Sequence, residues 1–151
     1  MNKARKRKLQ QIYAQIPKVN CKGKCTDYCG AIGMEKGEYE EMKKAAGKEP
    51  GILPDLTCNL LKDGRCSIYE DRPLICRLWG TFPASTCPHG CQPERWLTPN
   101  DFLKFMGKVK ELAGDGRTYK NCQDSDWQED LDKKRGTKEK FRDAYSYLLC
   151  K

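Results

Sequence analysis

Cysteine is the residue type in this sequence whose number and spacing point most clearly to chemistry. The chain of 151 residues contains ten cysteines, and cysteine thiolates are common ligands of zinc ions and iron–sulfur clusters. Two near-neighbour pairs are separated by only three residues, so that one short turn could direct both sulfur atoms at the same ion. Eight cysteines fall within one segment and are the predicted metal ligands: Cys21, Cys25, Cys29, Cys58, Cys66, Cys76, Cys87 and Cys91.

These ligands narrow the choice of metal without deciding it. Sulfur donors exclude magnesium and calcium, which bind oxygen, but they suit both a zinc ion and an iron–sulfur cluster. His89 lies between Cys87 and Cys91 and could replace one thiolate or stay solvated. Cys122 and Cys150 stand apart from the cluster, and we expect them to be small buried residues rather than ligands. The predicted cofactor is therefore zinc or iron, with an iron–sulfur cluster as one form.

The N-terminal segment and the hydropathy pattern indicate the cellular compartment in which the protein is expected. Residues 1–8 are strongly basic, but no apolar stretch typical of a secretion signal follows them. No run reaches the roughly 18 apolar residues needed to cross a bilayer. We therefore expect a cytoplasmic protein without a membrane partner, in which stable disulfides are disfavoured. The alternative is a trimmed precursor whose ten cysteines pair as disulfides.

The charge of the chain permits a nucleic-acid partner without favouring one. The formal net charge is +8 with every thiol counted as neutral, and thiolate ligands would lower it. Basic runs occur at residues 3–8, 133–135 and 138–142, but acidic residues accompany the C-terminal runs. No recognised reader helix or aromatic stacking platform is evident. A nucleic-acid-binding zinc protein is therefore an alternative only, and the sequence identifies no protein partner.

Two short elements should present cysteines from the middle of the chain. The Asp63-Gly64 turn signal between Cys58 and Cys66 predicts a small β-hairpin with one cysteine on each arm. After it, Asp71 could cap a short helix over residues 74–79 that presents Cys76. The predicted ligands would thus lie on a rigid turn and on a helix.

Helices should surround these elements. Apolar residues at helical spacing predict helices over residues 3–16 and near residues 38–46. Thr98, followed by Pro99 and Asp101, is a strong start signal for a further helix that should end at Gly114. A last amphipathic pattern begins at Thr137.

These predictions describe a mainly α, small, metal-stabilised single domain with one short β-hairpin. Hydrophobic residues make up 38% of the chain and charged residues 33%, so apolar burial is leaner than average and a metal should contribute to stability. Within this one domain, we assign residues 1–20 to a basic N-terminal helix, 21–97 to a cysteine-cluster metal-binding core, and 98–151 to C-terminal helices packed on that core.

Three blocks of sequence are similar to a known family. They cover residues 21–38, 58–80 and 87–91, and the second block contains the run Cys-Ser-Ile-Tyr-Glu-Asp-Arg-Pro-Leu-Ile-Cys-Arg that ends at Arg77. Over roughly residues 21–97, the chain resembles the YkgJ-type cysteine-cluster proteins, also described as the CxxCxxCC zinc- or iron-chelating domain. The resemblance implies metal binding but no settled reaction. Two departures leave one expected thiolate missing: the Cys-Cys doublet is Tyr28-Cys29 here, and the Cys-Pro step is Cys58-Asn59.

Two arginines flank one of the predicted ligands. Arg72 and Arg77 lie on either side of Cys76 in the sequence, and their guanidinium groups could donate hydrogen bonds to thiolates or to inorganic sulfide. We predict that both contact the cofactor. The alternative is an ordinary ion pair with Glu70 or Asp71.

The favoured function is that of a zinc- or iron-chelating module, structural or metal-carrying. The first alternative is an iron–sulfur enzyme or redox protein, and the second is the nucleic-acid-binding zinc protein. No catalytic residue can be named, because the single histidine sits between two predicted ligands and the sequence supports no hydrolytic triad. Whether the protein is an enzyme is left open.

Overall fold

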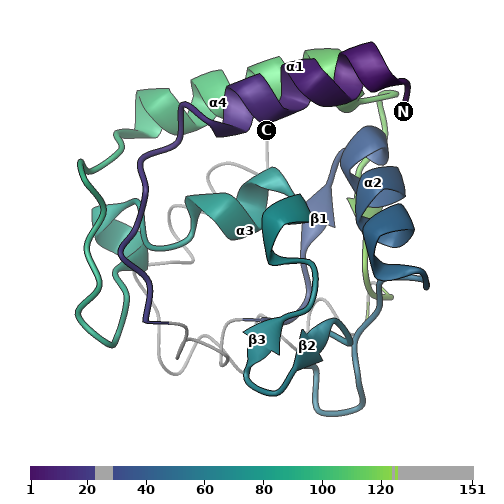
Figure 1. The fold of residues 1–151 in the computed structure, drawn as a ribbon, viewed down its shortest axis with the longest axis horizontal. Coiled ribbons are helices and arrows are strands. Elements are labelled where there is room, and N and C mark those ends of the chain that lie inside the picture. Colours follow the sequence, from purple (N-terminus) through teal and green to yellow (C-terminus); the bar gives the residue numbers. More distant parts are fainter. Residues whose placement is uncertain (23–28, 124, 126–151) are drawn as a thin grey trace.

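Two long helices lie side by side and run in opposite directions along one edge of the molecule (Figure 1). The computed structural model describes residues 1–22, 29–123 and 125, and these helices are α1, Lys3–Tyr13, and α4, Pro99–Ala113. The Asn2 side chain accepts a hydrogen bond from the Arg5 N–H at the start of α1. At the start of α4, Thr98 and Asp101 form the expected capping box.

The apolar faces of α1 and α4 form the larger of two hydrophobic cores. Spacing of three and four residues puts these side chains on one face of each helix. Helix α3, Leu74–Leu78, adds its first and last residues, both leucines. Aliphatic and aromatic side chains fill this core, with the ring of Phe82 packed edge-on against Phe102. Its buried members are Leu9, Tyr13, Ile16, Leu74, Leu78, Leu97, Phe102, Phe105, Val109 and Ala113.

Helix α2, Lys36–Ala46, ends before Gly47 as predicted and begins two residues before the expected start at residue 38. Glu35 and Glu38 form a capping box at its start, and Gly47 ends it with φ of 65°, a left-handed conformation that costs glycine little. Strand β1, Gly33–Met34, leads into this helix and pairs with β4, Tyr119–Lys120, in an antiparallel register of Gly33 with Lys120. The sequence analysis did not predict this strand pair.

The predicted hairpin is present. Strands β2, Leu61–Lys62, and β3, Arg65–Cys66, are antiparallel. Asp63 and Gly64 between them have φ of 50° and 75°, the two positive values that the tightest hairpin turns require.

Three short helical segments follow the hairpin, namely the 3-10 turn η1, Tyr69–Asp71, helix α3, Leu74–Leu78, and the 3-10 turn η2, Pro83–Ser85. The hairpin, β1 and α2 share a second, smaller core. Its buried members are Met34, Met42, Cys58, Leu60 and Ile68. Cys29 and Cys66 pack against it, so cysteines are part of its wall.

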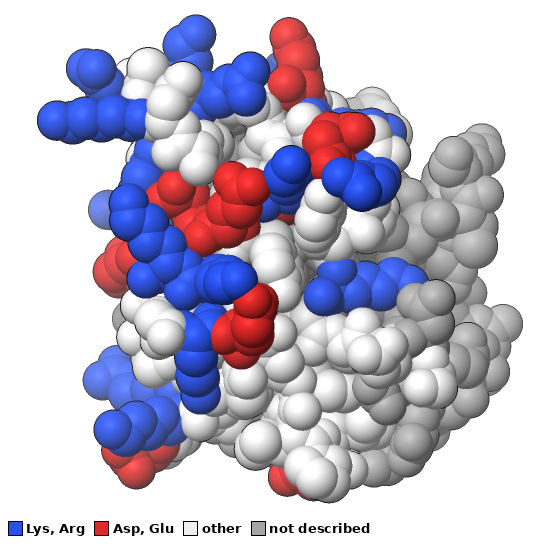
Figure 2. All heavy atoms as spheres, turned by 90° about the vertical axis from the view of Figure 1, so that its right-hand side faces the viewer, with Lys and Arg blue, Asp and Glu red and all other residues white. Residues whose placement is uncertain are grey.

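The observed fold confirms a small, mainly helical single domain with a hairpin. The predicted helix at Thr137 lies outside the described residues. No helix in the described part of the chain is long and apolar enough to cross a membrane. On the face shown in Figure 2, basic side chains are interspersed with acidic ones. One ion pair of the structure joins Lys6 Nζ to Glu41 Oε2 at 2.8 Å.

Candidate metal centre

The predicted ligands come from several parts of the fold. Cys29 precedes β1, Cys58 precedes β2, Cys66 ends β3 and Cys76 lies within α3. Cys21, Cys87 and Cys91 lie outside regular elements, whereas Cys25 is outside the described residues.

Three of these cysteines meet at the smaller core. The Cys58 N–H donates to the Cys29 carbonyl oxygen at 2.7 Å, so the two backbones are in direct contact. Cys66 pairs across the hairpin with Leu61, which follows Cys58 by only three residues. Cys66 and Cys29 also pack against the core that contains Cys58. Turn geometry and a long-range backbone bond thus gather three thiols.

Cys76 joins them from α3. Burial raises the pKa of the Cys76 thiol, the Arg72 guanidinium opposes this effect, and negative charge on Cys58, Cys29 or Cys66 would raise the pKa further. Coulomb interactions of this kind require proximity. We call Cys29, Cys58, Cys66 and Cys76 the inner cysteine group, because the first three lie within electrostatic range of the Cys76 sulfur.

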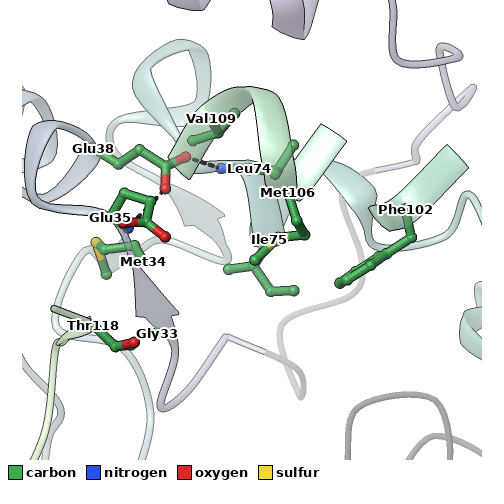
Figure 3. Close-up of a pocket in the computed structure, with 10 residues that line it drawn as sticks. All are labelled: Gly33, Met34, Glu35, Glu38, Leu74, Ile75, Phe102, Met106, Val109 and Thr118. Carbon is green, nitrogen blue, oxygen red and sulfur yellow. Dashed lines mark hydrogen bonds between the residues drawn. The ribbon is translucent and has the colours of Figure 1, made fainter. Parts of the chain in front are cut away.

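Helix α3 is held in place by a buried carboxylate. Glu38 is 4% exposed, and its Oε1 accepts hydrogen bonds from the Leu74 N–H at 2.7 Å (Figure 3) and the Tyr13 hydroxyl at 2.6 Å. The expected cap by Asp71 is wrong, because Pro73 occupies the N-cap position without a side-chain bond. Asp71 belongs to the preceding 3-10 turn, so a residue distant in sequence satisfies the free N–H instead.

Glu38 also borders a cavity of about 60 Å³ between β1, α3 and α4, lined mainly by apolar side chains such as Ile75, Phe102 and Met106 (Figure 3). Pockets for small-molecule ligands usually measure about 300–1,000 Å³. This cavity therefore does not support a substrate site beside the cysteines.

The two predicted cofactor-contacting arginines have different surroundings. The Arg72 guanidinium carbon lies 3.4 Å from the centroid of the Tyr69 ring, and its positive charge acts on Cys76. Arg77 donates through Nε to the Arg72 carbonyl oxygen at 2.7 Å, and its guanidinium carbon stacks 4.3 Å from the centroid of the Tyr13 ring. Arg72 is thus placed to stabilise thiolate charge, whereas the contacts of Arg77 join the backbone before α3 to helix α1.

The remaining predicted ligands that the structure describes, Cys21, Cys87 and Cys91, form what we call the outer cysteine group. Segment 18–22 runs beside segment 87–94: Val19 bridges to Pro93, and the Lys22 N–H donates to Cys91 Sγ at 3.4 Å. The His89 N–H donates to Cys87 Sγ, also at 3.4 Å. Backbone donors therefore face two sulfur atoms of this group, an arrangement that favours thiolate charge.

The donor set fits a thiophilic metal, although the side chains are not closed around one. In residues 1–22, 29–123 and 125, no three His, Cys, Asp or Glu side chains are arranged closely enough to hold an ion as they stand. The Arg72 guanidinium favours the Cys76 thiolate, whereas negative charge on Cys58, Cys29 or Cys66 would disfavour it. Four thiols with this environment match the donors that zinc and iron–sulfur clusters use.

Comparison with known families agrees with this chemistry. A family described as "CxxCxxCC: Putative zinc- or iron-chelating domain" matches residues 20–102, more than half of the chain. The chain belongs to this family. Searches of the curated proteins and of the solved structures found no match.

All eight predicted ligands lie within the CxxCxxCC segment, but one polar residue that touches the inner group lies beyond it. Asn121 is 3% exposed. Burial raises the pKa of the Cys58 thiol, and hydrogen bonding by the Asn121 side chain opposes that rise. The sequence analysis missed this residue, because it stands in a polar stretch and has no periodic or motif signal. Only the pairing of β4 with β1 brings it to the cysteines.

Proposed function

We propose that this chain chelates zinc or iron through the thiolates of its clustered cysteines, in a structural or metal-carrying role. The observation that carries the proposal is the inner cysteine group, in which Cys29, Cys58 and Cys66 lie at one core. Cys76 approaches them from α3, within the range of their charges. Cysteines that serve only as small buried residues have no need to share a neighbourhood.

The electrostatics of the inner group support a bound cation. Burial raises the pKa of both Cys58 and Cys76, and each thiolate would raise the pKa of its neighbours. Several thiolates this close repel one another unless positive charge lies between them, and a metal ion supplies that charge while releasing the thiol protons. Metal binding to such a site can contribute on the order of 10 kcal/mol, which is comparable with the stability of a whole domain.

We further propose that the two cysteine groups serve different tasks. The inner group lines a core and would hold a structural metal. The outer group combines the exposed Cys21 and the half-buried Cys87 with the buried Cys91. Because these cysteines lie on two loop segments and one of them is exposed, a metal bound there would be open to exchange. The role of metal carrier, if the chain has one, belongs to this outer group.

The first experiment is to measure zinc, iron and acid-labile sulfide in protein purified without oxygen, together with its visible spectrum. Zinc in a colourless sample supports the proposal in its structural form. Iron with sulfide in a brown sample would favour the iron–sulfur enzyme or redox alternative. Absence of any metal from protein with reduced thiols would refute the proposal.

A matched pair of variants assigns the ligands. Cys76→Ser should lose metal, because it removes one sulfur of the inner group. Cys150→Ser, which removes a cysteine outside the clustered segment, should keep the metal content of the unmodified chain. Equal metal content in both variants would contradict the ligand assignment.

A further inference from the structure

Asn121 is buried, and both the oxygen and the nitrogen of its side-chain amide form hydrogen bonds. Strand β4 ends one residue before it, and the pairing of β4 with β1 sets it opposite Ile32. The Ile32 N–H donates to Asn121 Oδ1 at 2.8 Å, and the Asn121 N–H donates to the Ile32 carbonyl oxygen at 3.3 Å. These two bonds fix the orientation of the amide.

The amide nitrogen then connects two parts of the inner group. Asn121 Nδ2 donates to the Gly30 carbonyl oxygen at 3.0 Å, next to Cys29. A primary amide has two N–H donors, and the second is available for the Cys58 sulfur with which the side chain interacts. One side chain thus holds the backbone beside Cys29 and the sulfur of Cys58 together.

An N–H donor aimed at sulfur has a specific value at a metal site. It stabilises negative charge on the thiolate, restricts the direction in which the sulfur points, and tunes the metal through its ligand. A buried neutral thiol gains less from such a donor, because charge-assisted hydrogen bonds are stronger than neutral ones. The position of Asn121 is therefore most useful when Cys58 is metal-bound.

We propose that Asn121 is a positioning residue of the metal centre: its amide orients the Cys58 sulfur and holds the Cys29 segment beside it. This inference rests on the proposed function. It also extends the site beyond the CxxCxxCC segment, since Asn121 follows the matched residues 20–102. The C-terminal strand β4 is then part of the metal-binding apparatus.

The test compares two asparagines in the full-length chain. Asn121→Ala removes the side-chain bonds to Ile32 and Gly30 and the interaction with Cys58. Asn59→Ala is the matched control, because the Asn59 side chain also bonds to backbone groups of another segment. It accepts from the Gly51 N–H at 3.0 Å and donates to the Glu49 carbonyl oxygen at 3.1 Å. Each protein is stripped of metal under reducing conditions and titrated with Co(II), which is then displaced by Zn(II).

We expect Asn121→Ala to bind Co(II) and Zn(II) about 10–100-fold more weakly and to shift the thiolate-to-cobalt charge-transfer band. Asn59→Ala should lose some thermal stability but keep both the affinity and the spectrum. If Asn121→Ala is insoluble, Asn121→Asp is measured in its place. This variant keeps an oxygen that can accept from the Ile32 N–H but has no N–H to donate to sulfur. We expect the same weakening of metal binding and the same band shift.

The outcomes separate the two proposals. If the unmodified protein binds metal and the Asn121 variant has the same affinity and the same spectrum, only the positioning role of Asn121 is overturned. Unmodified protein that binds none of Co(II), Zn(II) and Fe(II) would overturn the proposed function and the role of Asn121 with it.

Discussion

The inner and outer cysteine groups differ in what holds their sulfur atoms. The inner group is supported by regular structure, namely a two-residue turn, helix α3 and the β1–β4 pair, and it borders a hydrophobic core. The outer group lies on two loop segments joined by a few backbone contacts. Packed elements resist local opening more than loops do, so the same ligand chemistry should give one durable site and one labile site.

The largest effect should come from removing an inner sulfur. Cys76→Ser should lower the free energy of unfolding by roughly 3 kcal/mol or more, because it forfeits part of a metal-binding free energy on the order of 10 kcal/mol. Chemical denaturation of metal-loaded protein measures the loss. Cys87→Ser in the outer group is the control, and an equal loss in both variants would erase the distinction between the groups.

The next largest effect should be a difference in thiol reactivity between the outer and inner cysteine groups. After chelation of metal, iodoacetamide should modify Cys21 at least about tenfold faster than Cys76, because exposure and thiolate fraction govern cysteine reactivity. Cys21 is exposed, whereas burial raises the pKa of the Cys76 thiol. Mass spectrometry of timed digests gives the order of labelling. Simultaneous modification of both residues would show that the inner group opens as readily as the outer one.

A smaller effect should follow from loosening α3 without touching sulfur. Tyr13→Phe removes the hydroxyl that donates to Glu38 and should cost about 1 kcal/mol of stability, with metal content unchanged. Tyr39→Phe is the matched control, because its hydroxyl bonds to Glu49 at an exposed site, where the loss should be smaller. Loss of metal from Tyr13→Phe would mean that the position of α3 governs metal binding.

The smallest expected effect is that of acid on strand β4, which directly precedes Asn121. Hydrogen bonds from Arg117 and Tyr119 lower the pKa of Asp115 from 3.8 to about 2. Because the pKa is depressed in the folded chain, this contribution to stability is present above pH 3.8 and is lost as the pH falls through about 2.

Hydrogen exchange at Tyr119 and Lys120 should therefore quicken slightly over that interval, and Asp115→Asn should abolish this pH dependence. Asp115 is exposed to solvent, so the change should be small. An unchanged pH profile in Asp115→Asn would assign the acid sensitivity of β4 to another group.

Local signals in the sequence predicted most of the elements. The Thr98–Asp101 capping box, the stop at Gly47 and the Asp63-Gly64 turn are all present in the structure. Each depends on residues within a few positions of one another, and the backbone conformations they favour need no distant partner. The clustering of cysteines and the likeness to the CxxCxxCC family are properties of the sequence in the same sense.

Contacts between distant residues decided the rest. The cap of α3 comes from Glu38 instead of Asp71, and Asn121 reaches Cys58 only because Met34 pairs with Tyr119. The grouping of Cys76 with Cys29, and of Cys91 with segment 18–22, has the same origin. The sequence determined which residues could bind metal and which short elements carry them. The tertiary structure decided which sulfur atoms lie together, because packing of separate elements around two cores has no signature in local spacing.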